Sequence, residues 1–240
     1  MNRRTVEHVQ ASARLVEALL GDHALMAALG DVVQVCARTL RDGGKVLFAG
    51  NGGSAADAQH MAGEFVSRFH YDRPGMAAIA LTVDSSVLTA IGNDYGFERV
   101  FARQIEALGR PGDVLFAYST SGQSPNILAA LRAARERALR TVGLTGNRKG
   151  PMNALCDHLI EIPSASTPSI QEGHLIVGHA ICAALEEEMY PRIPALGAVP
   201  ATAQATPDAA PDAAPEAAPE AFPRGTATQR AVRAGPDHHG

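Results

Sequence analysis

The sequence predicts an α/β fold in which helices sandwich an open parallel β-sheet. Five short apolar runs, each of four to six residues, lie between residues 45 and 162. The runs are continuous rather than alternating, which is typical of strands buried on both faces. Segments of helical character separate the runs, and strands that alternate with helices over this length favour a parallel sheet covered by helices.

Two amphipathic helices are predicted before the first strand. The first carries apolar residues at intervals of three and four, namely Val6, Val9, Ala13, Val16 and Leu20. This spacing places the five side chains on one helix face, called here the N-terminal stripe. The second helix runs through residues 32–40 and ends at Gly43 and Gly44, because glycine is favoured just beyond a helix.

The remaining elements follow in strict alternation. The predicted strands are residues 45–49, 77–81, 113–118, 141–144 and 158–162. The predicted helices between and after them are residues 54–69, 84–91, 97–108, 125–138, 151–155 and 169–189. The last helix and the N-terminal stripe offer more apolar surface than one small domain needs, which predicts an oligomer. The alternative is that both helices only cover their own sheet.

The domain is predicted to span residues 1–190, with a disordered Pro/Ala-rich tail over residues 191–240. The tail holds 9 of the 15 prolines, and five of them recur every fourth residue, at Pro207, Pro211, Pro215, Pro219 and Pro223. Proline at this spacing forbids a regular helix, and the tail has little apolar surface to bury. Two histidines near its end, His238 and His239, are interpreted as part of a solvated terminus.

Composition and charge exclude several classes of protein. The chain has 240 residues, a net charge of −4 and a pI of about 6.1, whereas nucleic-acid binders and membrane-surface binders are usually basic. No apolar run is long enough for a transmembrane helix, and the N-terminus lacks the apolar run of a signal peptide. Three dispersed cysteines make neither a disulfide framework nor a zinc finger. We therefore expect a soluble protein of a reducing compartment.

Two loops rich in glycine and serine follow predicted strands and open predicted helices. The first, residues 50–54, reads Gly-Asn-Gly-Gly-Ser, and Ser54 with Asp57 resembles a capping box. Such a loop can present backbone N–H groups to an anion, or can simply allow a tight turn. It matches neither a Walker loop nor a dinucleotide-binding fingerprint.

The second loop, residues 119–125, reads Ser-Thr-Ser-Gly-Gln-Ser-Pro. Its four hydroxyls and the following helix N-terminus can hold a phosphate monoester without lysine or arginine. Ligands bind open sheets at the carboxyl ends of parallel strands. Two such loops on neighbouring strands therefore strengthen the prediction of a binding site there.

Ionisable residues on two helices form a possible metal site. His60 and Glu64 are four residues apart and share one helix face, either as metal ligands or as a surface pair. His179 lies among apolar neighbours on the last helix, where a histidine is more often a core residue than a ligand. Gln171 precedes it by eight residues, roughly 12 Å of helix rise. If both serve one site, either they lean together or different subunits supply them.

Several motifs together closely resemble the bacterial phosphoheptose isomerases, which have the sugar isomerase (SIS) fold. The resemblance covers residues 1–190 and rests on residues 50–60, Glu64, Arg73-Pro74-Gly75, residues 90–96, Ser119-Thr120-Ser121-Gly122 and Ile170-Gln171-Glu172. It implies isomerisation of sedoheptulose 7-phosphate to D-glycero-D-manno-heptose 7-phosphate, the first step towards nucleotide-activated heptose for lipopolysaccharide. It also implies a cytoplasmic homotetramer with active sites at subunit interfaces and one zinc per subunit.

The resemblance also implies roles for individual residues. The zinc ligands would be His60, Glu64, Gln171 and His179, and the acid–base pair would be Glu64 and His179. The sugar would contact Asn51, Gly52, Gly53, Ser54, Glu64, Asn93, Asp94 and Gln171, and the phosphate would contact Ser119, Thr120, Ser121 and Ser124. One departure is that residues 164–169 carry no carboxylate where the family often has an aspartate, which affects the expected substrate orientation or rate.

Two other functions fit part of this pattern. One is that of a non-enzymatic SIS paralogue that binds the replication initiator DnaA, and it is disfavoured because that paralogue lacks the full acid–base set. The other is an SIS activity on a different sugar phosphate, such as pentose- or hexose-phosphate isomerisation or sugar-phosphate sensing.

Overall fold

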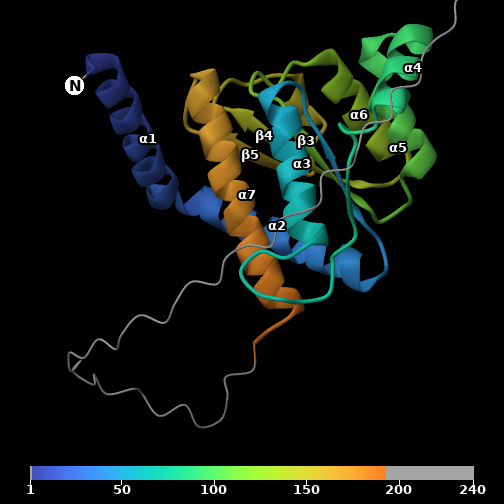
Figure 1. Ribbon diagram of the computed structural model, residues 1–240, viewed down its shortest axis with the longest axis horizontal. Coiled ribbons are helices and arrows are strands. Elements are labelled where there is room, and N and C mark those ends of the chain that lie inside the picture. Colours follow the sequence, from blue (N-terminus) through green and yellow to red (C-terminus); the bar gives the residue numbers. More distant parts are fainter. Residues whose placement is uncertain (1, 193–240) are drawn as a thin grey trace, which may run out of the picture. The chain divides into compact units, whose positions relative to one another are not determined.

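The computed structural model describes residues 2–192 (Figure 1). The predicted disordered tail lies outside the described residues apart from Pro191 and Arg192. The described residues form the five-stranded sheet that the sequence predicts, in the order β2-β1-β3-β4-β5 with every neighbouring pair parallel. The strands are β1 (Val46–Ala49), β2 (Ala78–Ala80), β3 (Val114–Tyr118), β4 (Arg140–Gly146) and β5 (His158–Ile162).

Burial on both faces holds for the central strands and is wrong for the two edge strands. β1 and β3 are buried at every position, whereas β2 and β5 each have exposed or half-buried residues because they have a neighbour on one side only. Alternate side chains of β1 enter two separate cores. Val46 and Phe48 pack with one cluster, and Leu47 and Ala49 pack with the other.

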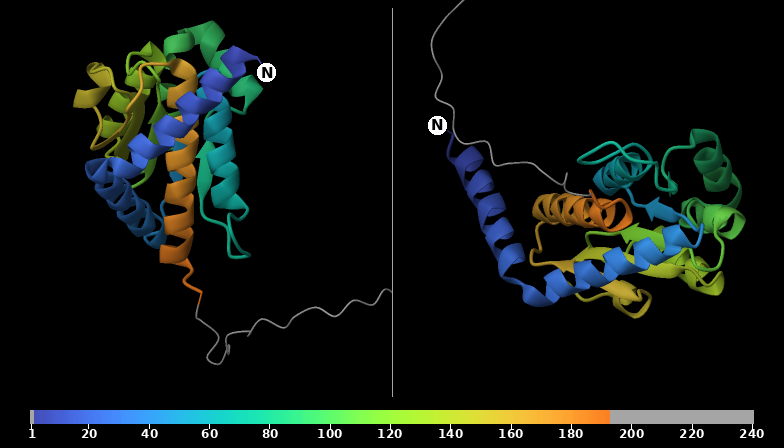
Figure 2. Two further views of the ribbon diagram at one scale, coloured as in Figure 1. Left: turned by 90° about the vertical axis from the view of Figure 1, so that its left-hand side faces the viewer. Right: turned by 90° about the horizontal axis from the view of Figure 1, so that it is seen from below.

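Helices cover both faces, as the sequence predicts (Figures 1 and 2). The first core contains residues of α1 (Arg3–Gly21), α2 (His23–Arg41), α3 (Gly53–Val66) and α7 (Thr167–Met189). The second core contains residues of α5 (Ala102–Leu108) and α6 (Pro125–Glu136), with partly buried residues of α4 (Ser85–Tyr95) packed against it. The predicted helix over residues 97–108 is broken into the short 3-10 helix η1 (Phe97–Arg99) and α5, and residues 151–154 form the 3-10 helix η2 (Pro151–Ala154).

The N-terminal stripe faces solvent rather than the sheet. The buried residues of α1 are Leu15 and Leu19, which lie on another face of the helix. Two residues of the stripe, Val9 and Leu20, are 62% and 68% exposed. The helix projects beside α7 in both figures, and its Ser12 hydroxyl donates a hydrogen bond of 2.8 Å to Glu172 of α7. The described chain therefore leaves this apolar stripe uncovered, unlike α7, which covers its own sheet.

None of the described helices is by itself long and apolar enough to cross a membrane. Among the described residues, one pair of consecutive helices, α1 with α2, would together have the length and composition of a membrane span, but the pair is bent by 75°.

Candidate active site

The two predicted ligand-binding loops lie next to each other. β1 and β3 are hydrogen-bonded neighbours, so the loops that follow them leave the same edge of the sheet. The side-chain amides of Asn51 and Asn126 join the loops through two reciprocal hydrogen bonds, each of 2.8 Å. Asn126 lies in the first turn of α6, and no local sequence pattern singles it out. This amide pair fixes the position of one loop against the other.

Gly52 rather than Ser54 caps α3, so the predicted capping box is wrong. Gly52 has a φ of 57°, a left-handed conformation that favours glycine, and the helix begins at the next residue. Ser54 therefore lies within the first turn, where its side chain is buried. Asp57 makes no cap and leaves one carboxylate oxygen buried without a partner among the described residues. Burial raises the pKa of Asp57, with His60 opposing the shift.

The second loop presents hydroxyls at the start of α6. Ser119 is buried and its hydroxyl lies 3.0 Å from that of Ser124, while Thr120 is half-buried and Ser121 is exposed. Gly122 turns the loop with a φ of 66°. No side chain caps α6. Pro125 has no N–H, and the N–H groups of Ile127 and Leu128 donate to the carbonyl of Ser124, so the N–H of Asn126 is the one in this turn without a partner among the described residues. No lysine or arginine lies within residues 119–125.

Three of the four predicted metal ligands meet where α3 packs against α7. The Nε2 atoms of His60 and His179 are 2.8 Å apart, and His60 Nε2 lies 3.5 Å from Glu64 Oε1. One ligand atom from each of the three residues lies within 4.8 Å of the others. Chain segments more than a hundred residues apart in sequence thus supply one compact cluster, called here the helix cluster.

The surroundings of one member of this cluster, His179, favour its neutral form. Burial lowers the pKa of His179, His60 adds to the shift, Glu64 opposes it, and His70 lowers it further. A neutral imidazole can accept a proton or a metal ion. The contact with His60 contradicts the interpretation of His179 as an isolated core residue.

The side chain of Gln171, the fourth predicted metal ligand, lies against the start of α3. A Cβ atom built on Gly53 would lie 2.4 Å from the Nε2 atom of Gln171, so this side chain rests against the first loop. Further along the same two helices, a Cβ atom built on Gly178 of α7 would lie 2.4 Å from the sulfur of Met61 of α3. Because later residues of α3 meet later residues of α7, the two helices run in parallel. Along α7, Gln171 precedes His179 by about two helix turns, roughly 12 Å of rise. Only glycine at position 53 leaves room for the amide in this place.

The other predicted sugar contacts lie on the opposite layer of the domain. Asn93 and Asp94 belong to the exposed last turns of α4, and their side chains bond to each other at 2.8 Å. No hydrogen bond joins them to the two loops within residues 2–192. Residues 164–169, which lack the expected carboxylate, form the end of the last loop and the first turn of α7, just before Gln171.

The sequence interpretation missed a buried ion pair beside the helix cluster. Arg73 Nε and Glu186 Oε1 are 3.0 Å apart, and the two side chains are 1% and 0% exposed. The Arg73-Pro74-Gly75 motif was noticed, but its role could not be inferred because the partner is 113 residues away on α7.

Comparison with known proteins agrees with this architecture. A family model for the SIS domain matches residues 7–146. Phosphoheptose isomerases from Burkholderia pseudomallei (strain 1710b) and Aneurinibacillus thermoaerophilus are 58% and 50% identical to the chain; the alignments cover 76% and 79% of this chain and 92% and 96% of theirs.

Solved structures give the same result. The phosphoheptose isomerase of Neisseria gonorrhoeae aligns with a TM-score of 0.72 at 41% identity, and that of Francisella tularensis with 0.74 at 33%. Each alignment covers 77% of this chain and 97% of the other. The chain belongs to the phosphoheptose isomerase family of SIS-domain proteins.

Proposed function

We propose that this protein converts sedoheptulose 7-phosphate into D-glycero-D-manno-heptose 7-phosphate through an enediol, with Glu64 and His179 as the acid–base pair. Membership of the family makes the protein an aldose–ketose isomerase of heptose biosynthesis. The observation that carries the residue assignment is the helix cluster, which places a carboxylate and two imidazoles within reach of one small ligand.

Two proton transfers are needed, and the cluster has a group for each. A ketose becomes an aldose when a proton moves from C1 to C2 and another moves between their oxygens. The carboxylate of Glu64 takes the carbon proton and returns it to the neighbouring carbon. His179, whose lowered pKa keeps its imidazole neutral, moves the oxygen proton.

The loop after β3 holds the phosphate. The hydroxyls of the loop, on Ser119, Thr120, Ser121 and Ser124, and the N–H of Asn126 at the start of α6 supply donors without a charged side chain. The first loop, with Asn51, Gly52, Gly53 and Ser54, lies beside it and contacts the sugar. Binding energy from the phosphate thus orients the reacting end of the sugar toward the helix cluster.

The chemistry of the helix cluster supports a zinc ion held by His60, Glu64 and His179. Zinc accepts imidazole nitrogen and carboxylate oxygen at about 2.0–2.2 Å, which requires ligand atoms only a few ångström apart. When bound, zinc would polarise the substrate carbonyl. Gln171, whose side chain lies against Gly53 at the start of the helix that carries His60 and Glu64, would be the fourth ligand.

The assembly is proposed to be a cytoplasmic homotetramer with active sites between subunits. The N-terminal stripe, which the described residues leave uncovered, supports an oligomer. A monomer with full turnover would contradict this arrangement.

The direct test is to incubate the purified protein with sedoheptulose 7-phosphate and to follow the aldose by NMR. Ribulose 5-phosphate and fructose 6-phosphate serve as competing ketoses. Preferred conversion of the heptulose supports the proposal. Preferred conversion of another ketose would assign the site to a different sugar, and no conversion of any ketose would favour a binding protein.

A further inference from the structure

A second set of contacts, centred on Arg73 and Glu186, lies beside the helix cluster. The guanidinium of Arg73 donates hydrogen bonds of 2.7 Å to the carbonyl oxygens of both Glu64 and Phe65. It also donates to the carbonyls of Ser67 at 3.4 Å and Pro74 at 3.1 Å. α3 ends at Val66, so carbonyls in its last turn have no N–H partner within the helix. Arg73 therefore caps the turn that carries Glu64.

Glu186 binds the chain segment that follows α3. Besides the ion pair with Arg73, its carboxylate accepts hydrogen bonds from the backbone N–H groups of Phe69 at 2.9 Å and His70 at 2.7 Å. Burial alone would raise the pKa of Glu186, but these two N–H groups and Arg73 bring it below its usual value, so the group stays ionised.

Phe69 links this carboxylate to the helix cluster. Its ring centroid lies 5.3 Å from that of His179, at an interplanar angle of 39°. Glu186 itself lies seven residues beyond His179 on α7, two turns along the helix. One end of the ion pair thus fixes the backbone of Glu64, and the other fixes the ring that packs on His179.

We propose that Arg73 and Glu186 are positioning residues that set the distance between the Glu64 carboxylate and the His179 imidazole. This inference rests on the proposed function for its kinetic readout, and its ligand-binding and spectroscopic readouts do not depend on turnover. Planar guanidinium geometry is needed to reach two helix carbonyls and a carboxylate together, which explains why arginine rather than lysine occupies the position.

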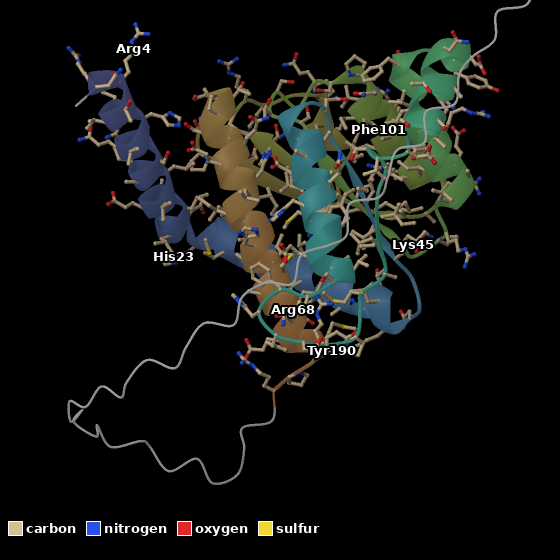
Figure 3. The ribbon with its side chains drawn as sticks, in the orientation of Figure 1. Arg4, His23, Lys45, Arg68, Phe101 and Tyr190 are labelled. Atoms are coloured by element: carbon tan, nitrogen blue, oxygen red, sulfur yellow. The ribbon has the colours of Figure 1, made fainter. Side chains whose placement is uncertain are left out.

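The chain contains a matched control for this ion pair. Asp113 is 1% exposed and pairs with Lys45, and its carboxylate also accepts two backbone N–H groups, from Lys45 at 2.9 Å and Arg110 at 2.8 Å. It precedes β3, at the opposite end of that strand from the phosphate loop. Figure 3 shows Lys45 well apart from Arg68 and Tyr190, the labelled residues next to the Arg73–Glu186 region.

The experiment compares Glu186→Gln with Asp113→Asn. Both substitutions weaken a buried ion pair, so both are expected to lower the thermal midpoint by similar amounts. Only Glu186→Gln should lower kcat, by tenfold or more, while KM changes less than threefold because the phosphate loop is untouched. Zinc affinity should fall by about 10- to 100-fold, the range typical for groups that orient metal ligands. The NMR signal of the His179 ring should shift in Glu186→Gln and stay in place in Asp113→Asn.

A second variant guards against simple unfolding. Arg73→Lys keeps the positive charge opposite Glu186 but removes the guanidinium N–H groups that bind the carbonyls of Glu64 and Phe65. We expect this variant to fold, with reduced zinc affinity and reduced kcat. The proposal is overturned if Glu186→Gln and Asp113→Asn change zinc affinity equally, or if Arg73→Lys matches the unsubstituted protein in zinc affinity and in the His179 signal. If zinc affinity and the His179 signal change as expected but the unsubstituted protein converts no sedoheptulose 7-phosphate, the proposed function fails and the positioning role stands.

Discussion

The loops at the strand ends and the helix cluster are the two regions of the proposed site, and they contain different chemical groups. Residues 50–54 and 119–125 offer backbone N–H groups, hydroxyls and two side-chain amides, and they carry no charged side chain. The helix cluster offers a carboxylate and two imidazoles, brought together from α3 and α7. This contrast underlies the proposal that the loops bind the substrate and the helix cluster transfers protons. Substitutions in the loops should therefore act on KM, and substitutions in the cluster on kcat.

The largest expected effect lies in the helix cluster. His179→Gln removes the group that moves the oxygen proton and should lower kcat by roughly 10²- to 10⁴-fold, the usual contribution of a positioned acid or base. Steady-state kinetics with sedoheptulose 7-phosphate measure this loss.

The matched control is His70→Gln, because His70 affects His179 electrostatically but belongs to neither region. It should change kcat less than threefold. An equal loss of kcat in the two variants would show that His179 has no special role in moving the oxygen proton.

The next effect concerns His174, which lies between the two regions. Its ring centroid is 5.7 Å from that of Tyr118 at the end of β3, and it lies on α7 five residues before His179. Neither ring nitrogen has a hydrogen-bond partner within residues 2–192, and burial lowers the pKa of His174 to about 4, with the backbone of Thr145 opposing the shift. The folded state therefore favours the neutral ring.

The sign of the pH dependence follows from this lowered pKa. The stabilisation is present above the unfolded pKa of about 6.5 and is lost as the pH falls toward 4, a change of about 3 kcal/mol in the free energy of unfolding. His174→Gln should lack this part of the acid sensitivity. Urea unfolding of both proteins between pH 7 and pH 4 measures the difference, and parallel curves would show that His174 is charged or exposed in the folded state.

The loop after β3 should give a smaller effect, on affinity alone. Thr120→Ala or Ser124→Ala removes one hydroxyl bond to a charged phosphate, worth about 1.5–3 kcal/mol, and should weaken binding of the ketose phosphate roughly 10- to 150-fold. Affinity for unphosphorylated sedoheptulose should hardly change. Calorimetry with both sugars tests the assignment, because an equal loss for the two would make the loop structural.

The smallest effect is expected from the C-terminal residues. Deleting residues 195–240 should leave kcat, KM and the oligomeric state unchanged, because every proposed site residue lies at or before His179. Activity assays and size-exclusion chromatography of the truncated protein check this. A truncated protein that falls to monomers, or loses most of its turnover, would extend the site into that segment.

Local patterns predicted one of the two regions well and the other only in part. The five strands and both strand-end loops were predictable because buried runs and glycine-serine clusters are signals carried by adjacent residues. The two strands that carry these loops were expected to be neighbours, and the pairing of β1 with β3 confirms it. The helix cap was mispredicted at Ser54 because Gly52 can adopt a positive φ that sequence preference for serine does not reveal.

The helix cluster needed information that no local pattern carries. His60 and Glu64 share a face by their spacing, but the meeting of His60 with His179 depends on how α3 packs along α7. The same holds for the Arg73–Glu186 pair and for the Asn51–Asn126 bridge, whose partners are 113 and 75 residues apart. The family resemblance supplied His179 as a ligand, and it supplied none of these other partners. The placement of Gln171 beside Gly53 likewise emerges only from the packed helices.

The most direct test of the division between binding and proton transfer is Glu64→Gln. The amide cannot take the carbon proton, so turnover of sedoheptulose 7-phosphate should vanish while calorimetry still detects binding of the ketose phosphate through the loops. Glutamine keeps the size of the side chain and the i,i+4 position beside His60. Turnover within about threefold of the unsubstituted protein would exclude Glu64 as the base and contradict the account.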